Sequence, residues 1–135
     1  MDAEAAARRW AATWTAAWPA HDVEAIVALV RRRLRAPLDA VPPAAPRAPG
    51  RARDYLTGAF AEERRVDDVR FGTPVVRGAR AFVEYRARFL DDRGAPMTLA
   101  GCAVARFDRD GLVSEARDYW HVEPGDHPPA EGWDG

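Results

Sequence analysis

Asp118 is the residue of this sequence whose surroundings point most directly to acid/base chemistry. It lies in the stretch 112–122, where polar and apolar side chains alternate with the two-residue period of a strand. On the inward sides of the predicted strands, Asp118 is the only ionisable acid. A carboxylate on such a face loses hydration, which raises its pKa toward neutrality. We therefore interpret Asp118 as a candidate general acid or base that removes a proton next to a carbonyl or activates a water.

Few other polar side chains share the predicted inward face with Asp118. Tyr85 is a candidate hydrogen-bond donor to a developing oxyanion, and Thr73 and Ser114 supply hydroxyls. Four aromatic residues would form flat apolar walls for a ring-shaped ligand, namely Trp14, Trp18, Tyr55 and Trp120. Together with Thr73, they are the candidate substrate-binding residues. Small residues leave room for a cavity on this face, namely Gly101, Ala103, Ala105 and Ala116.

A structural interpretation competes with this catalytic one. Asp118 could cap a loop or pair with an arginine, and the tryptophans could simply fill the core, because ion-pair networks also produce inward-facing acids. The alternation of residues does not decide between the two.

The elements that would position these side chains are helices first and strands afterwards. Asp2 predicts a helix cap, and the helix is expected to run to about Trp18, where Pro19 ends it. Further helices are expected over 22–30 and about 52–61, and strands over 69–76, 79–90, 97–107 and 112–122. Short links between the strands predict a mostly antiparallel sheet, so the fold class is α+β with the helices on one sheet face.

Composition limits the possible partners. The chain has 135 residues, enough for one domain, and its formal net charge of −1 argues against nucleic acid or an anionic membrane. The single cysteine, Cys102, fits a reducing compartment, and the first twenty residues lack an apolar signal segment, so we expect a cytoplasmic protein. His21, His121 and His127 lack ligand spacing, so no metal is expected, and no phosphate-binding glycine loop indicates a cofactor.

The stretch Arg31–Arg53 differs from the rest of the chain, because it holds seven arginines and five prolines against one acid, Asp39. Proline lacks an N–H donor, so a strand is not expected here. GC-rich DNA that is translated out of frame yields sequences rich in arginine, proline and alanine. One hypothesis is therefore a frameshift from about Val30 to Gly50, corrected before Arg51. A genuine proline-rich loop and a basic nucleic-acid arm are the alternatives.

Several segments together resemble a known family. The segments HDVEAIVALV (21–30), DYLTGAF (54–60), FGTPVVRGARAFVEY (71–85) and DGLVSEARDYWHV (110–122), in this order and spacing, look like the SnoaL-like branch of the nuclear transport factor 2-like superfamily. The resemblance covers residues 1–125 as a single domain, except for the atypical segment 31–50. It leaves 126–135 as an irregular tail, in which Trp133 is expected to dock.

The resemblance implies a cone of three helices around a curved mixed sheet, with a pocket at the open end and usually a dimer through the sheet. SnoaL-like polyketide cyclases use an aspartate near the end of the last strand as acid/base, and Asp118 occupies the similar place. The implied function is isomerase, cyclase or hydrolase chemistry on an apolar cyclic or ketonic ligand, without a cofactor. A non-catalytic ligand-binding or interaction module is the alternative, because a fold alone does not confer activity. If segment 31–50 is genuine, the chain is expected to lack the first strand of the family's sheet.

Overall fold

The computed structural model describes residues 1–31, 39–41 and 52–134, the short middle piece by its backbone alone. The helices are α1 (Ala3–Ala20), α2 (Val23–Val27) and α3 (Ala52–Ala61). The strands are β1 (Asp39–Val41), β2 (Glu63–Phe71), β3 (Val75–Arg77), β4 (Arg80–Asp91), β5 (Pro96–Phe107) and β6 (Val113–Pro124). The frameshift hypothesis falls mainly on residues outside these ranges, and it stays a prediction.

Helix α1 begins where the sequence predicts and ends two residues later than expected. The Asp2 side chain accepts a hydrogen bond from the Ala5 N–H at 2.8 Å, which caps the first turn. The expected end at Trp18 is wrong, since Pro19 lies inside the last turn. His21 ends the helix with φ of 51°, a left-handed conformation that turns the following N–H, of Asp22, back to the Ala17 carbonyl at 2.9 Å.

The other two helices are short. The Asp22 side chain caps α2 through the Ala25 N–H at 3.1 Å, but the helix ends at Val27 instead of continuing to Val30. The remaining residues form turns, and Val30 makes an isolated bridge to Val113 of β6. Helix α3 has the bounds that its apolar spacing predicts and buries Leu56 and Phe60.

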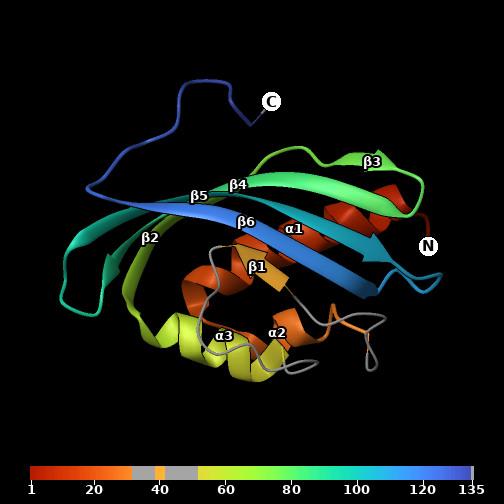
Figure 1. Cartoon of the computed structure of the whole chain (residues 1–135), viewed down its shortest axis with the longest axis horizontal. Helices are drawn as coiled ribbons and strands as arrows, with labels where there is room; N and C mark the ends of the chain where they lie inside the picture. Colours follow the sequence, from red (N-terminus) through yellow and green to blue (C-terminus); the bar gives the residue numbers. More distant parts are fainter. Residues whose placement is uncertain (32–38, 42–51, 135) are drawn as a thin grey trace.

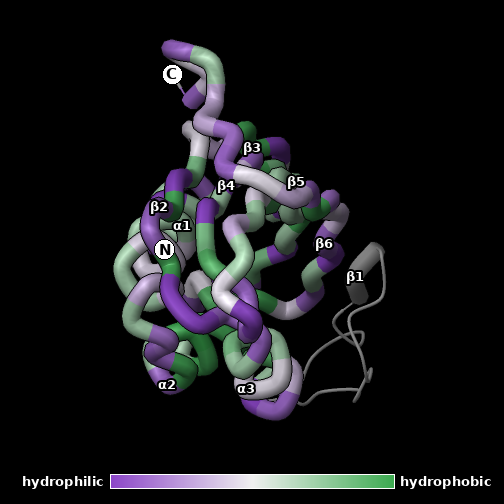
Figure 2. Tube along the Cα trace, turned by 90° about the vertical axis from the view of Figure 1, so that its left-hand side faces the viewer, coloured by the Kyte–Doolittle hydropathy of each residue, from purple (hydrophilic) through white to green (hydrophobic). Residues whose placement is uncertain are grey.

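The strands form one curved sheet in the order β1-β6-β5-β4-β2, with β3 also paired to β4. All pairs are antiparallel except β1 with β6, so the sheet is mixed, as the resemblance implied. The three helices lie together on one side of the sheet (Figure 1). Seen from the side, α2 and α3 lie below the strands, and the C-terminal segment rises on the opposite side (Figure 2). The predicted α+β class is confirmed.

The prediction that the Arg/Pro-rich stretch Arg31–Arg53 contains no strand is wrong. β1 pairs in parallel with β6, and Ala40 lies in register with Asp118. Pro37 and Pro42 lie outside the three paired residues, so the missing proline N–H groups leave this short ladder intact. The chain therefore keeps a strand beside Asp118.

The strand predicted over 69–76 is also different in the structure. It is two strands: β2 begins at Glu63, and Gly72–Pro74 separate it from β3. Residues 63–68 were not predicted as a strand, because charged side chains interrupt their apolar alternation.

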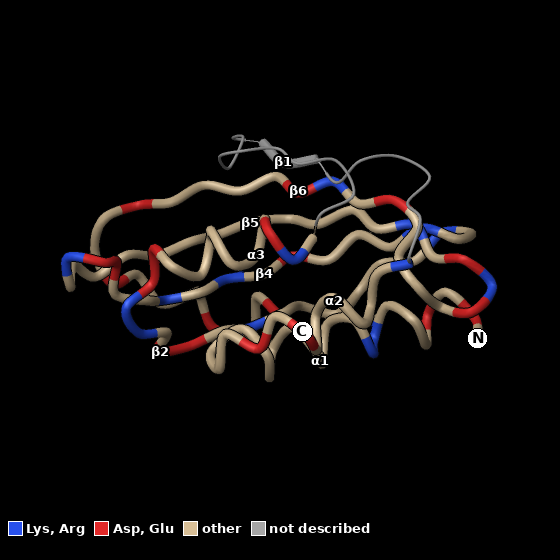
Figure 3. The backbone as a smooth tube through the Cα atoms, turned by 90° about the horizontal axis from the view of Figure 1, so that it is seen from below, with Lys and Arg blue, Asp and Glu red and all other residues tan. Residues whose placement is uncertain are grey.

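Acidic and basic residues are interspersed along the chain, in keeping with its net charge near zero (Figure 3).

The predicted alternation of β4 and β5 is correct in their central parts. Val83, Tyr85, Ala87 and Phe89 are buried toward the helices, whereas Glu84 of β4 is exposed on the other face. The buried core continues through the helices and the turn after α2, with Trp10, Trp18, Ile26, Leu29 and Leu56. We call the side that packs on the helices the inner face and the other side the outer face.

Candidate functional site

A tyrosine and an aspartate from two non-adjacent strands meet on the inner face. The Tyr85 hydroxyl donates a hydrogen bond to Asp118 Oδ1 at 2.5 Å. Tyr85 belongs to β4 and Asp118 to β6, and β5 lies between them. Tyr85 is in register with Gly101, and Asp118 with Ala103, so the two side chains meet over small residues of the central strand.

Gly101 allows this meeting because it has no side chain. A Cβ atom at this position would lie 2.5 Å from Tyr85 Cζ and 2.6 Å from its hydroxyl oxygen. The tyrosine ring therefore lies directly against the backbone of β5. The sequence interpretation assigned this space to a cavity, whereas at Gly101 the ring of Tyr85 fills it.

Burial changes the protonation of both partners. Loss of hydration raises the pKa of Asp118 to about 6, and the hydrogen bond from Tyr85 offsets part of this rise. Burial and the neighbouring Asp118 also raise the pKa of Tyr85 above its ordinary value, so its hydroxyl is a donor at neutral pH. Burial, with a smaller contribution from Asp118, raises the pKa of Tyr55 to about 12. Three protic groups thus converge, and the carboxyl is the one that titrates near neutrality.

Aromatic rings from α1 and β2 surround Tyr85. The ring centroids of Trp18 and Tyr85 are 5.8 Å apart, and those of Phe71 and Tyr85 are 5.2 Å apart. Trp14 contacts Trp18 edge-on at 5.8 Å. Phe71 was not among the predicted site residues, although its inward position in the strand pattern is the signal that identifies it. Trp14, Trp18 and Tyr85 are thus brought together as one aromatic wall.

Two further predicted residues have different surroundings. Trp120 follows Asp118 by two residues and is half-buried, and its Nε1 is buried without a partner among the described residues. Thr73 is exposed, and its hydroxyl donates to the Asp134 carbonyl oxygen at 3.4 Å. The inward position expected for Thr73 is wrong, because the strand ends at Phe71 and the alternation ends with it.

A second buried acid, Glu63, was missed by the sequence analysis. Its side chain is 8% exposed and accepts hydrogen bonds from Trp18 Nε1 at 2.9 Å and from His21 at 3.0 Å. The His21 ring stacks on Phe60 at 4.6 Å. Burial raises the Glu63 pKa, while the bonds from Trp18 and His21 act in the opposite direction. Asp118 is therefore not the only inward acid, and Glu63 holds a tryptophan that contacts Tyr85.

A cavity of about 650 Å³ lies on the outer face of the sheet, against the C-terminal segment. Its floor includes Ala100 and Cys102 of β5, and Pro129 and Trp133 lie across it. Among the described residues, no group of three or more His, Cys, Asp and Glu side chains is placed to hold a metal ion. No helix in the described part of the chain is long and apolar enough to cross a membrane.

Solved structures share this fold at low sequence identity. An epoxide hydrolase/cyclase-like enzyme, SalBIII, with a role in pyran ring formation in the polyether salinomycin, has a TM-score of 0.68 and 16% identity over 90% of this chain and 99% of its own. A putative isomerase from Rhodopseudomonas palustris has a TM-score of 0.65 and 11% identity over 85% and 88% of the two chains. A hypothetical protein with a ketosteroid isomerase-like fold from Catenulispora acidiphila, in complex with trimethylamine, has a TM-score of 0.65 and 17% identity over 80% and 82%. At these identities, the likeness concerns the fold.

The comparison of families is more specific. The profile of the SnoaL-like domain matches residues 7–116, most of the chain. The match ends two residues before Asp118, so it carries no role over to that carboxyl. A comparison with curated proteins finds no match. On the strength of the matched residues and the fold, the chain belongs to the SnoaL-like domain family.

Proposed function

We propose that this SnoaL-like protein performs acid/base chemistry on an apolar cyclic or ketonic ligand, with Asp118 as the group that moves the proton. The hydrogen bond between Tyr85 and Asp118 Oδ1 is the observation that carries the proposal. With a pKa of about 6, the carboxyl is mostly ionised at neutral pH and remains close enough to that pH to return a proton.

In this proposal, the two oxygens of Asp118 have different roles. Oδ1 accepts the bond from Tyr85, and Oδ2 accepts no hydrogen bond from the described side chains. Oδ2 is therefore the atom that takes a proton from the carbon next to a carbonyl, as the C–H electron pair moves to form an enolate. Returning the proton to another carbon completes an isomerisation, and returning it to the same carbon gives exchange.

Tyr85 then stabilises the charge that develops. While Asp118 is ionised, its negative charge holds the Tyr85 hydroxyl. Once Asp118 is neutral, the enolate oxygen is the stronger acceptor, and the hydroxyl is expected to donate to it instead. The pKa of Tyr85, raised above its ordinary value, keeps the hydroxyl protonated throughout. The rings of Trp14, Trp18, Tyr55 and Trp120 are proposed to contact the ligand.

Proton exchange gives a direct test that needs no knowledge of the natural substrate. 2-Tetralone is a cyclic ketone with exchangeable protons beside its carbonyl, and NMR in D₂O follows their loss. We expect the protein to accelerate exchange and Asp118→Asn to abolish the acceleration while the variant remains folded. An unchanged rate in Asp118→Asn would refute the role of this carboxyl.

A non-catalytic ligand-binding module is the second candidate, and the packing of the site favours it in one respect. The Tyr85 ring occupies the space above Gly101, and the hydroxyl already has a partner. Such a site binds apolar compounds and releases them unchanged. Tetralone that binds, as shown by quenching of tryptophan fluorescence, without accelerated exchange would support this candidate over the enzyme.

Two broader expectations remain part of the proposal. Exposed Phe82 and Tyr119 on the outer face support a homodimer through the sheet. The free Cys102 is compatible with a reducing, cytoplasmic compartment.

A further inference from the structure

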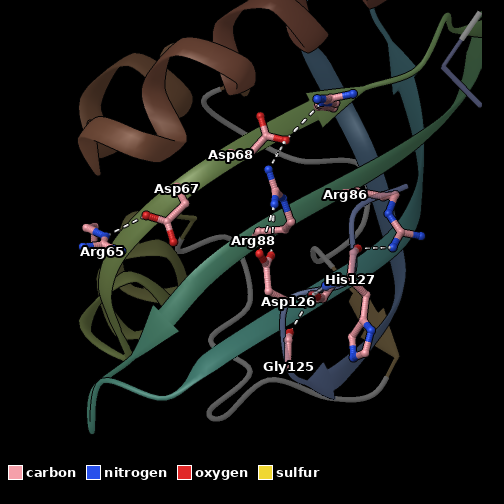
Figure 4. Close-up of polar contacts among 10 residues, drawn as sticks. Arg65, Asp67, Asp68, Arg86, Arg88, Gly125, Asp126 and His127 are labelled. Atoms are coloured by element: carbon pink, nitrogen blue, oxygen red, sulfur yellow. Dashed lines mark hydrogen bonds and ion pairs between the residues drawn. The ribbon is translucent and has the colours of Figure 1, made fainter. Parts of the chain in front are cut away.

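Glu63 differs from the other two acids of β2, because no arginine pairs with it among the described residues. Figure 4 shows Asp67 beside Arg65 and Asp68 beside Arg88, with nitrogen–oxygen distances of 2.6 and 3.4 Å. The side chains of these aspartates are 41% and 26% exposed, whereas that of Glu63 is 8% exposed. A carboxylate that is buried without an arginine is costly, so its position in this fold needs an explanation.

The pairing of β2 with β4 turns Glu63 inward. Val66 lies in register with Phe89, and Glu63 with Asp91, two residues further along β4. Alternate residues of a strand share a face, so Glu63 lies on the inner face with the buried Phe89. The ladder is irregular directly after Glu63. Such bulges redirect side chains beside functional sites.

Both carboxylate oxygens of Glu63 are bonded to aromatic rings. Trp18 Nε1 donates to Oε1 at 2.9 Å and to Oε2 at 3.2 Å. His21 Nε2 lies 3.0 Å from Oε1, and its ring stacks on Phe60 of α3 with an interplanar angle of 8°. Glu63 therefore ties the last turn of α1 to the start of β2 and fixes the polar edge of the Trp18 indole.

Trp18 connects Glu63 to the acid/base pair. It is 6% exposed, and its ring packs against Tyr85 at 5.8 Å and against Phe71 at 6.5 Å. Phe71 stacks on Tyr85 at 5.2 Å, and Gly101 leaves the space that the tyrosine ring fills. The hydroxyl of this confined ring donates to Asp118 Oδ1.

The hydrogen bond at the edge of Trp18 does what ring packing alone does not. Contacts between aromatic rings tolerate a range of angles, whereas an N–H donor requires an acceptor in line with it. A buried N–H without a partner is costly, so the indole of Trp18 would turn toward another acceptor if Glu63 were apolar. Because interiors are closely packed, Tyr85 would then move as well.

We propose that Glu63 is a positioning residue, which holds the Trp18 indole and through it keeps the Tyr85 hydroxyl on Asp118 Oδ1. His21 supports Glu63 from the solvent side, where the histidine side chain is 31% exposed. The inference rests on the proposed function and extends its machinery to a second buried acid, which acts through two rings instead of touching the ligand.

Three variants separate the hydrogen bond from the size and charge of the side chain. Glu63→Leu removes the acceptor, and Trp18→Phe removes the donor while Glu63 stays in place. Glu63→Gln removes the charge but keeps the shape and a carbonyl oxygen that accepts from Trp18 Nε1. Glu62→Leu, at the neighbouring exposed acid, is the matched control.

Titration of the Asp118 carboxyl by ¹³C NMR measures the effect without a substrate. The hydrogen bond from Tyr85 lowers the pKa of Asp118, so its loss in Glu63→Leu and in Trp18→Phe is expected to raise this pKa above about 6. Glu63→Gln and Glu62→Leu should titrate like the wild type. The double variant Glu63→Leu with Trp18→Phe should shift no further than the single variants, because both remove the same bond.

Tetralone exchange measures the consequence for catalysis. We expect Glu63→Leu to lower kcat about tenfold or more with little change in KM, and Glu63→Gln to restore most of the loss, because the misplaced pair no longer fits the transition state. A wild type that does not accelerate exchange refutes the acid/base proposal. The titration then still tests whether Glu63 positions Tyr85.

Two outcomes of the titration would overturn the inference. An unchanged or lowered Asp118 pKa in folded Glu63→Leu shows that Tyr85 is held without Glu63. A shift in Glu63→Gln as large as that in Glu63→Leu assigns the effect to the charge of Glu63 instead of its hydrogen bond. If Glu63→Leu does not fold, Trp18→Phe gives the first decision, because it removes the same bond from the other side.

Discussion

Replacing Asp118 by asparagine should stabilise the protein at neutral pH, although it removes the proposed catalytic group. The pKa of Asp118 rises from 3.8 to about 6 on folding. At about 1.36 kcal/mol for each pH unit, holding the ionised carboxylate in the folded site costs up to about 3 kcal/mol. Asp118 is only half-buried, so solvent lowers this figure, and asparagine bonds Tyr85 more weakly than a carboxylate does. We expect Asp118→Asn to be about 1–2 kcal/mol more stable at neutral pH.

The sign of the pH dependence follows from the raised pKa. Between about pH 4 and pH 6, the unfolded chain has released the proton of Asp118 while the folded protein retains it. The stability of the wild type, measured against the variant, should therefore fall as pH rises through this window and level off above it. Contributions from other titrating groups cancel in the difference between the two proteins.

Urea unfolding followed by tryptophan fluorescence at several pH values measures this difference. Asp110→Asn is the matched control, because Asp110 lies exposed in a turn away from Tyr85 and Asp118. A difference between Asp118→Asn and the wild type that stays constant from about pH 4 to 7 would refute the argument that burial raises this pKa.

Two further predictions concern the backbone under Tyr85 and the atypical segment. Gly101→Ala places a methyl group 2.5 Å from Tyr85 Cζ, so we expect a loss of about 1–3 kcal/mol in the free energy of unfolding. In the same urea experiment we expect a stronger pH dependence, because displacing Tyr85 removes the hydrogen bond that offsets the rise in the Asp118 pKa. Gly58→Ala is the control, because Gly58 lies in α3 with nothing within 4 Å of the new Cβ, and we expect this variant to be as stable as the wild type or more stable. Equal effects on stability at the two glycines would contradict the packing argument. Sequencing the coding DNA across codons 28–53 tests the frameshift hypothesis, which predicts a restored acidic segment; an unshifted frame makes the segment genuine.

Local signals in the sequence were sufficient where one residue or one period determines the structure. The Asp2 side chain caps the first helix, and the apolar spacing of 52–61 gave the bounds of α3. Alternation placed Tyr85 inward and Glu84 outward on β4, because a strand presents successive side chains to opposite faces. Family resemblance added the order of the elements, and the matched residues 7–116 confirm it.

Most of the errors share one cause, which is that they concern where a pattern stops. Thr73 continues the alternation in the sequence, but β2 ends at Phe71 and the following turn exposes the threonine. Pro19 was expected to end α1, yet it lies inside the last turn and the helix continues to Ala20. Glu63 stands just after a helix, where no periodic signal distinguishes a buried acid from an exposed one.

The sequence by itself determined the class of fold, the family and the inward position of Asp118, since propensity, caps and two-residue alternation act over a few neighbouring residues. Only the tertiary structure decided which groups meet. Tyr85 reaches Asp118 across β5 because Gly101 leaves the space, and Asp126 reaches Arg88 because the chain turns back after β6. Such contacts join residues 33 or 38 positions apart, and their register depends on the pairing of whole strands, which no short segment encodes.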